Sequence, residues 1–177
     1  FMISESGIAN DLYKMFHVLF GGVKGGLAIG TMFMMVAISA MNGLSVAGMA
    51  IGATIALPEM LRRNYDKRMI TGVVQAGSSL GILIPPSVVM VLYGMIARQP
   101  VSKLWMAGIL PGLLMAFLFL IYIYVRCKLQ PELGPPLKKE ERSVSTIEKI
   151  RLLKAGIIPF LIFFFMTGLF LMGIASL

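Results

Sequence analysis

Two consecutive prolines stand at the centre of a long apolar segment of this chain. Residues 69–97 contain no Asp, Glu, Lys or Arg, and their middle reads Gly77-Ser78-Ser79-Leu80-Gly81-Ile82-Leu83-Ile84-Pro85-Pro86-Ser87. An α-helix cannot continue through both prolines, because each lacks a backbone N–H and its ring clashes with the preceding turn. The sequence therefore predicts a membrane helix that is interrupted halfway.

An interrupted helix inside a bilayer exposes backbone groups that need a partner. Each unpaired N–H or C=O in hydrocarbon costs several kcal/mol, so a break is tolerated only where it is buried in protein or lines a polar cavity. Many secondary transporters use such breaks to present carbonyl oxygens and helix ends to ions and anionic substrates. The segment thus indicates that the protein is a transporter. A plain proline kink packed by small residues is the competing explanation.

The composition indicates that the whole chain belongs in a membrane. Of its 177 residues 58% are hydrophobic, the mean hydropathy is +0.87 and only 14% are charged. Soluble domains carry about 25% charged residues, so a soluble fold is excluded. The single Cys127 and the single His17 predict neither an internal disulfide nor a metal cluster. The chain begins at Phe1 and ends in an apolar stretch, and we expect it to be a piece of a longer protein.

Charge-free stretches divide the chain into candidate membrane segments. The stretch 25–58 is too long for one crossing and short for two. Because Asn42-Gly43 near its middle is a strong turn signal, a hairpin that enters and leaves on one side is favoured over two tilted full spans. The sequence predicts an all-α integral membrane protein with an amphipathic connecting helix (1–24), a re-entrant helical hairpin (25–61), a broken transmembrane helix (69–98), a transmembrane helix (104–126), a cytoplasmic loop (128–145), and an amphipathic start followed by another transmembrane helix (146–177).

The basic residues predict how these segments are oriented. If the hairpin enters and leaves on one face, fourteen of the 16 Lys and Arg residues share that face, and only Arg98 and Lys103 lie opposite. Lys and Arg accumulate in cytoplasmic loops, so the shared face is expected to be cytoplasmic. Topology then accounts for the net charge of +8. A nucleic-acid partner is not expected, because the cations flank apolar helices without interleaved aromatic residues.

The residues around the break resemble a known family. The run Gly81–Ser87, preceded by Ala76–Ser79 and followed by Val88–Gly94, resembles the signature of the large membrane subunit, or permease (M) subunit, of TRAP transporters, the tripartite ATP-independent periplasmic carriers of bacteria. Further matches occur in the family's order at Ser6–Ala9, Leu12-Tyr13, Gly25–Ala28, Leu57–Met60, Tyr65-Asp66 and Ala107–Gly112. By this comparison the chain is similar to the N-terminal half of that subunit.

The resemblance implies a sodium-coupled importer of the elevator type, in which this chain would be one half of an inverted repeat. It implies a multi-pass protein of the bacterial inner membrane that works with a small membrane subunit and a periplasmic binding protein delivering an organic acid. The family's hairpin tip usually reads Ser-Gly-x-Ser, whereas this chain has Asn42-Gly43-Leu44-Ser45. One hydroxyl and the glycine are kept, and an amide replaces the first serine.

We expect a sodium ion between the hairpin tip and the break. Sodium is a hard cation that binds several oxygens, and Pro85 and Pro86 free the carbonyls about four residues earlier, near Gly81 and Ile82. Gly77 and Gly81 are expected to let the backbone turn and approach closely. The expected sodium ligands are Asn42, Gly43, Ser45, Gly77, Ser78, Ser79, Gly81, Ile82, Ile84 and Pro85. A carboxylate would bind at the positive end of the helix that restarts after Ser87, and the expected substrate-binding residues are Ser45, Ser79, Pro86 and Ser87.

Enzymatic activity is not expected. The sequence has no GxSxG, no P-loop, no His cluster and no intramembrane carboxylate pair. Glu59 lies within a turn of Arg62 and Arg63, which predicts a surface ion pair rather than a proton relay. Two alternatives to transport remain, a non-transporting membrane scaffold or assembly subunit, and an intramembrane hydrolase with Ser87 as its nucleophile.

Overall fold

The computed structural model describes residues 13–16, 19–20, 22–135, 161, 165 and 168–169. Most of these residues are helical and none of them lies in a strand, which confirms the all-α expectation for this part of the chain. The elements are α3 (Gly26–Asn42), α4 (Ser45–Arg62), α5 (Lys67–Ser79), the 3₁₀ turn η1 (Leu80–Ile82), α6 (Val88–Ala97), α7 (Val101–Leu129) and the 3₁₀ turn η2 (Pro131–Leu133). Most of the connecting helix expected over 1–24, and nearly all that was expected beyond residue 135, lies outside the described residues.

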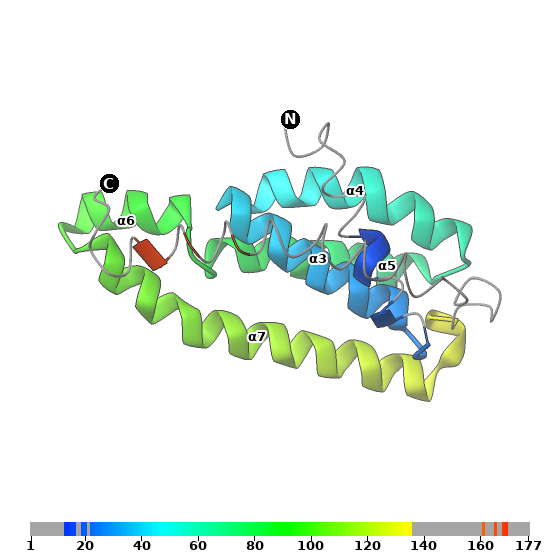
Figure 1. The fold of residues 1–177 in the computed structure, drawn as a ribbon. Helices are drawn as coiled ribbons and strands as arrows, with labels where there is room; N and C mark the ends of the chain where they lie inside the picture. The colour runs from blue at the N-terminus through cyan, green and yellow to red at the C-terminus, as the bar shows by residue number, and fades with distance from the viewer. Residues whose placement is uncertain are drawn as a thin grey trace.

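Helices α3 and α4 form a helical hairpin (Figure 1). At its tip Gly43 adopts the left-handed conformation, with φ of 64°, and its N–H donates to the Ser39 carbonyl at 2.8 Å. A glycine in this conformation is a common way to end a helix, because it has no Cβ to clash. Leu44 is extended and α4 begins at the next residue. The turn thus stands where the Asn42-Gly43 pair indicates.

The helix that carries the two prolines is interrupted. α5 ends at Ser79, η1 adds one tight turn, and the chain is irregular from Leu83 until α6 begins at Val88. The peptide bond between Pro85 and Pro86 is cis. The break in the helix expected over 69–98 is therefore present, and it separates α5 from α6.

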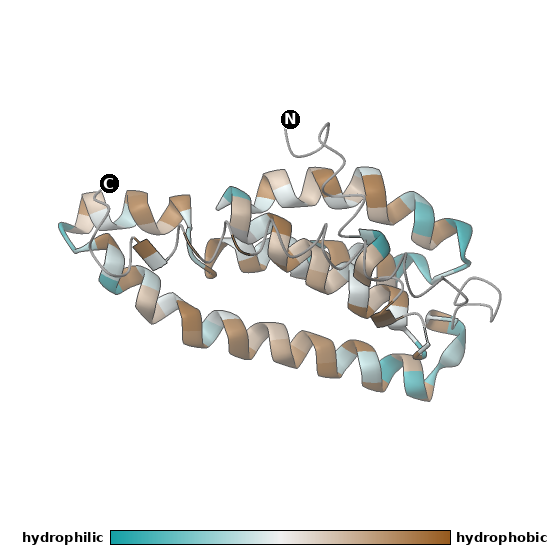
Figure 2. Ribbon diagram, viewed as in Figure 1, coloured by the Kyte–Doolittle hydropathy of each residue, from teal (hydrophilic) through white to brown (hydrophobic). Residues whose placement is uncertain are grey.

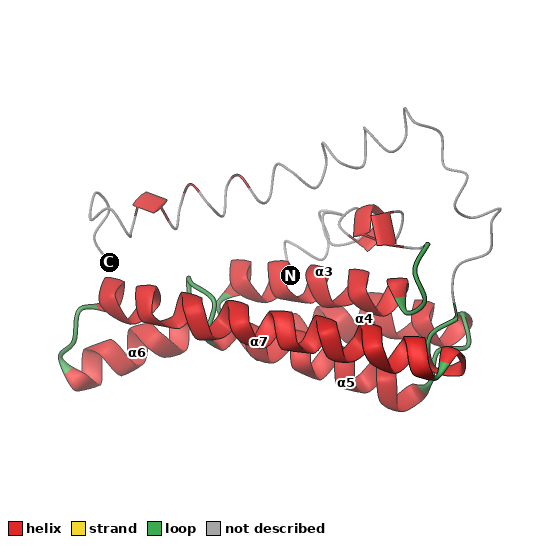
Figure 3. Cartoon of the chain, turned by 90° about the horizontal axis from the view of Figure 1, so that it is seen from below, coloured by secondary structure: helices red, strands yellow, loops and turns green. Residues whose placement is uncertain are grey.

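Helix α7 runs back along the whole broken helix (Figures 1 and 3). It has 29 residues, which at 1.5 Å per residue is about 43 Å and exceeds the roughly 30 Å of a hydrocarbon core. By length and composition it could cross a membrane. It packs against α3, α6 and η1, and its other faces expose large apolar side chains such as Leu110, Phe117 and Tyr122.

The core lies around α3. α4, α5 and η1 all pack against this helix, and its side chains Met32, Met34 and Met35 are at most 1% exposed. Glycines on the neighbouring helices let the backbones approach: a Cβ on Gly77 of α5 would stand 2.5 Å from the Met35 Cβ. Gly77 is therefore a packing residue in the interior of α5.

The start of α3, the start of α5 and the end of α7 are joined by main-chain hydrogen bonds. The Gly25 N–H donates to the Gly134 carbonyl at 3.0 Å, and the Asp66 N–H donates to the Leu133 carbonyl at 3.3 Å. Cys127 is fully buried beside this junction, and a Cβ on Gly25 would lie 2.6 Å from its Sγ. The segment after α7 is thus fixed to the base of the hairpin.

Polar residues collect at the two ends of the bundle, with apolar helix between them (Figure 2). The end formed by the bases of α4 and α5 and the last turn of α7 carries Arg62, Arg63, Lys67, Arg68, Arg126 and Lys128. The connection between α6 and α7 at the opposite end carries Arg98, and Lys103 follows in the first turn of α7.

The ion pair expected at Glu59 is confirmed. Its Oε2 lies 3.1 Å from Arg62 Nη2, and its Oε1 lies 2.7 Å from Arg63 Nε. Arg62 is largely exposed, so its contact is a surface pair, which contributes at most about 1 kcal/mol. The Arg63 and Glu59 side chains are only 18% and 22% exposed, so their contact is partly buried. The carboxylate lies in the last turns of α4 at the basic end, far along the chain from the break.

Two glycines of α5 allow a matched test of this packing. Gly77→Ala should destabilise the protein by about 1–3 kcal/mol, since overpacking a filled core forces side chains or backbone to shift. Gly72→Ala should leave stability unchanged or raise it by up to about 1 kcal/mol, because a Cβ there meets nothing within 4 Å. The melting temperature of the detergent-solubilised, full-length permease measures both. Equal effects of the two substitutions would show that α5 does not pack on α3 through Gly77.

Candidate functional site

The tip of the hairpin contacts the break in the helix. The Val88 N–H, the first of α6, donates to the Gly43 carbonyl at 3.2 Å. A Cβ on Gly43 would stand 2.5 Å from the Pro86 carbonyl oxygen. The backbone of the hairpin tip is therefore in direct contact with the backbone of the break. Position 43 admits only glycine, because of this contact and because its conformation is left-handed. Two segments predicted to form one site are in contact here.

Four helix ends meet at this contact. α3 and η1 end at Asn42 and Ile82, while α4 and α6 begin at Ser45 and Val88. Helix C-terminal ends carry partial negative charge and N-terminal ends partial positive charge. The same place thus combines carbonyl oxygens for a cation with the positive ends of two helices for an anion, which is the arrangement that broken helices provide in many transporters. At α6 the N–H groups of Val88 and Met90 are already bonded to Gly43 and Ser87, so its attraction for an anion comes from the helix end as a whole.

The break leaves backbone oxygens without their usual donors. The residues four positions after Gly81 and Ile82 are Pro85 and Pro86, which have no N–H. Among the turn and loop hydrogen bonds of residues 22–135, none ends on either of these two oxygens, whereas the Leu80 carbonyl accepts the Ile84 N–H at 2.9 Å. The oxygens predicted to be freed are thus left for another partner.

Ser39 is a polar group of the site that the sequence reasoning missed. It lies on α3, one turn before the tip, and is 0% exposed. A Cβ on Gly81 would stand 2.6 Å from the Ser39 Cβ and 2.8 Å from its carbonyl oxygen. The Ser39 Oγ has no hydrogen-bond partner among the described residues. The Oγ faces Gly48 of α4, since it is the atom that a Cβ on Gly48 would meet first. A buried hydroxyl left unsatisfied costs about 1–3 kcal/mol, so this oxygen, enclosed between α3 and α4 one turn before the tip, is suited to a further ligand.

Three other side chains near the break turn their protons toward their own helices. The Ser78 hydroxyl donates to the Gln75 carbonyl at 2.9 Å, and the Ser79 hydroxyl donates to the Ala76 carbonyl at 2.8 Å. The Asn42 amide nitrogen likewise donates to the Ile38 carbonyl at 2.8 Å. In each case the donor is used locally, which leaves oxygen lone pairs available to a cation.

Some expected site residues have a different role in the structure. Gly77 packs on Met35 of α3, one turn before the break. Gly77 and Gly81 were expected to let the backbone turn and approach closely. Neither has a positive φ, which among the described glycines occurs at Gly25 and Gly43, whereas the close approach is present, since Gly81 lies against Ser39. The role of Gly81 follows from the missing Cβ rather than from an unusual backbone conformation.

Ser87 holds the second half of the broken helix in place. Its Oγ accepts the Met90 N–H at 3.4 Å as the N-cap of α6, and its carbonyl accepts the Trp105 Nε1–H at 3.3 Å. The residue is 1% exposed. A hydroxyl that is buried and engaged in a cap is poorly placed to attack a substrate, so this geometry gives the hydrolase alternative no support.

Helix α7 covers the break through two glycines. A Cβ on Gly108 would stand 2.6 Å from the Leu83 carbonyl oxygen, and one on Gly112 would stand 3.0 Å from Ile84 Cγ1. Small residues four apart let backbones approach closely within membranes. The irregular chain between η1 and α6 is therefore contacted both by the hairpin tip and by α7.

The sequence was compared with known proteins. Residues 1–176 match the family described as Tripartite ATP-independent periplasmic transporter, DctM component. The chain is 36% identical over 123 residues to the C4-dicarboxylate TRAP transporter large permease protein DctM of Pseudomonas aeruginosa, covering 70% of this chain and 29% of that protein. It is 34% identical over 118 residues to the ectoine/5-hydroxyectoine TRAP transporter large permease protein UehC of Ruegeria pomeroyi, covering 66% and 27%.

A third relative is named for another substrate. The chain is 32% identical over 122 residues to the isethionate TRAP transporter permease protein DctMQ of Oleidesulfovibrio alaskensis, covering 69% of this chain and 19% of that protein. The matched segments span less than a third of the length of these relatives. The family match over nearly the whole chain shows that it belongs to the DctM family, the large permease component of TRAP transporters.

Proposed function

We propose that this chain forms the N-terminal half of the transport machinery of a TRAP permease that imports an organic acid together with sodium. The contact of Gly43 with Pro86 and Val88 carries the proposal, because it places oxygens that lack donors beside helix N-termini. The complete permease would reside in the bacterial inner membrane. It would act with a small membrane subunit and a periplasmic binding protein, and move its substrate by an elevator mechanism.

The arrangement of the helices supports a re-entrant hairpin. α3 has 17 residues, about 25 Å at 1.5 Å per residue, whereas α7 is about 43 Å long. The hairpin begins and ends at the basic end of the bundle, and its tip meets the middle of the broken helix (Figure 1). Since basic ends face the cytoplasm, the hairpin would enter from the cytoplasm and stop at mid-membrane.

A sodium ion would bind where the hairpin tip meets the break. Hard cations prefer oxygen ligands, and the carbonyls of Gly81 and Ile82 lie at this place. The Ser39 hydroxyl, which faces Gly48 of α4, would turn toward the ion and supply a further oxygen. The hydroxyls of Ser78 and Ser79 lie in the preceding turn. The remaining expected ligands are Asn42, Gly43, Ser45, Ile84, Pro85 and Gly77, of which Gly77 lies one turn before the break in α5.

An anionic substrate would bind beside the ion. The N-terminal ends of α4 and α6 favour negative charge, and Ser45 and Pro86 lie at these ends. Relatives are named as carriers of C4-dicarboxylates and of sialic acid, so an organic acid is the proposed class. Sodium bound next to a carboxylate would strengthen the binding of both, because opposite charges attract strongly where water is excluded.

Ser39 provides a test of the ion site. In the complete transporter, reconstituted with its partner proteins, Ser39→Ala should lower the apparent sodium affinity at least about tenfold, since one hydrogen-bonding or ligating oxygen contributes about 1.4 kcal/mol or more when charge is involved. Folding should be retained, because the removed hydroxyl has no partner among the described residues. Sodium-dependent substrate uptake measures the effect.

Thr54→Ala is the matched control for the loss of a hydroxyl. The Thr54 Oγ is exposed and bonds only to carbonyls of its own helix, at 3.1 Å and 3.0 Å, so its removal should leave sodium dependence unchanged. If Ser39→Ala behaved like this control, the proposed ion site would be wrong. A non-transporting scaffold would be indifferent to both substitutions.

The tip glycine provides a second test. Gly43→Ala places a Cβ 2.5 Å from the Pro86 oxygen at a φ of 64°, and a left-handed residue with a Cβ costs about 1–2 kcal/mol before any clash. The variant should lose the rise in melting temperature that sodium gives to a protein that binds it only when folded. Thermal unfolding with and without sodium measures this.

Gly25→Ala is the control, because Gly25 has a similar φ of 74° but lies at the other end of α3. It should lower stability to a similar degree and keep the sodium-dependent shift. Equal shifts in the two variants would separate the hairpin tip from sodium binding.

A further inference from the structure

A cavity of about 770 Å³ lies between α5 and α7, away from the contact of tip and break. Its walls are apolar and consist mainly of Met69, Val73, Ala76, Leu118, Phe119 and Ile123. On the α5 side Gly72 lines it, and a Cβ there would meet nothing within 4 Å. The described residues therefore leave an unfilled apolar groove beside the core, large enough for a sizeable ligand.

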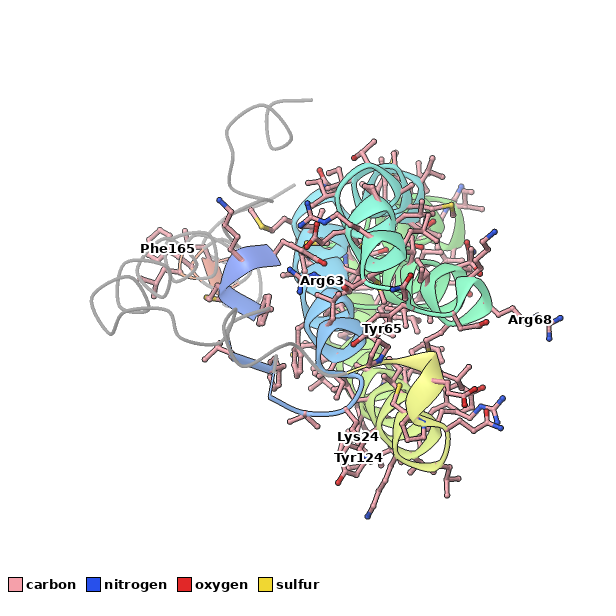
Figure 4. The ribbon with its side chains drawn as sticks, turned by 90° about the vertical axis from the view of Figure 1, so that its right-hand side faces the viewer. Lys24, Arg63, Tyr65, Arg68, Tyr124 and Phe165 are labelled. Carbon is pink, nitrogen blue, oxygen red and sulfur yellow. The ribbon has the colours of Figure 1, made fainter. Side chains whose placement is uncertain are left out.

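The groove has one polar rim, at the basic end of the bundle. Arg68 and Arg126 lie on it from opposite helices, together with Asp66 and Gln130. The Asp66 Oδ1 accepts the N–H groups of Arg68 and Met69, at 2.9 Å and 3.1 Å, and so caps α5. Figure 4 looks onto this end and shows the Arg68 side chain extending away from the start of α5. Both guanidinium groups are on exposed residues.

The dimensions of the groove match half a bilayer. From Arg68 to Ala76 on α5, and from Arg126 to Leu118 on α7, the wall runs eight residues, which is about 12 Å at 1.5 Å per residue. Half a hydrocarbon core is about 15 Å thick. With the basic end facing the cytoplasm, the rim would lie at the headgroups and the apolar wall would reach toward the bilayer centre.

We propose that this groove binds one anionic glycerophospholipid of the cytoplasmic leaflet. Its phosphate would lie between Arg68 and Arg126, because guanidinium groups bind phosphate oxygens in a bidentate manner. One acyl chain would fill the space along Gly72 and the apolar wall. The charge of the rim favours this occupant over an apolar helix, since basic pockets between membrane helices bind anionic headgroups. This lipid site is separate from the proposed sodium site. It rests on the proposed function only for the orientation of the bundle, with the basic end facing the cytoplasm.

The lipid would join two helices that have few direct contacts. α7 packs against α3, α6 and η1, and the cavity separates much of it from α5. Filling this space would add dispersion contacts along both helices and stabilise their arrangement. The bound lipid would therefore raise the melting temperature of the permease, as any ligand of the folded state does.

Delipidated full-length permease, titrated with phosphatidylglycerol and, separately, phosphatidylethanolamine, tests the proposal. Native mass spectrometry counts the bound lipids and thermal unfolding measures the stabilisation. Phosphatidylglycerol should bind and raise the melting temperature more than phosphatidylethanolamine. Replacing Arg68 and Arg126 together by Gln should weaken phosphatidylglycerol binding about thirtyfold, since each basic residue near an anionic leaflet contributes a factor of about five.

Two further variants separate the headgroup from the acyl chain. Gly72→Leu should fill the groove and reduce binding of both lipids while both arginines remain, because the space around Gly72 is open. Replacing Arg98 and Lys103 together by Gln removes the same charge at the opposite end and should change nothing. Equal binding of the two lipids, or phosphatidylglycerol binding that survives both the double arginine substitution and Gly72→Leu, would overturn the proposal. So would a wild-type permease that binds no lipid because another segment of the complete protein occupies the groove.

Discussion

One hydrogen bond between the hairpin tip and the start of α6 determines how the candidate site is built. The carbonyl of Gly43 accepts the first N–H of α6, at 3.2 Å. This bond is possible only because Gly43 has no side chain between the tip and Pro86. It fixes the depth at which the hairpin ends relative to the break. The negative ends of α3 and η1 and the positive ends of α4 and α6 are therefore held in one place, where a cation and an anion could bind side by side.

The position of this contact depends in turn on the packing of α3. Ser39 fits against Gly81, and Met35 fits against Gly77, so that any larger residue on the broken helix would push the hairpin away. Four helical elements surround α3, which is why most of its described residues are buried and none of them is exposed. The same packing leaves the Ser39 hydroxyl enclosed without a protein partner. Close packing and the proposed ion binding thus use the same small residues.

The break and the hairpin tip could be predicted from the sequence, because both depend on the backbone properties of a few neighbouring residues. Pro85 and Pro86 lack N–H groups wherever they occur, and Asn42-Gly43 favours a turn, so both the break and the tip could be located in advance. The role of Ser39 could not, because it depends on how α3 lies against η1. Gly77 was expected to let the backbone turn at the break. Its contact with Met35 depends instead on how α5 packs against α3, which the sequence does not show. The groove between α5 and α7 likewise has no signal in the sequence, since it arises from the spacing of two helices.

The junction at the basic end affects how this part of the protein could move. Gly25 precedes α3 and Gly134 follows η2, and these two residues are hydrogen bonded to each other at 3.0 Å. A displacement of the chain before Gly25 or after Gly134 would therefore act on the bundle at nearly the same point. In the proposed elevator, a displacement applied at this point would carry α3–α7 together, so that the site would keep its geometry while its depth in the membrane changed.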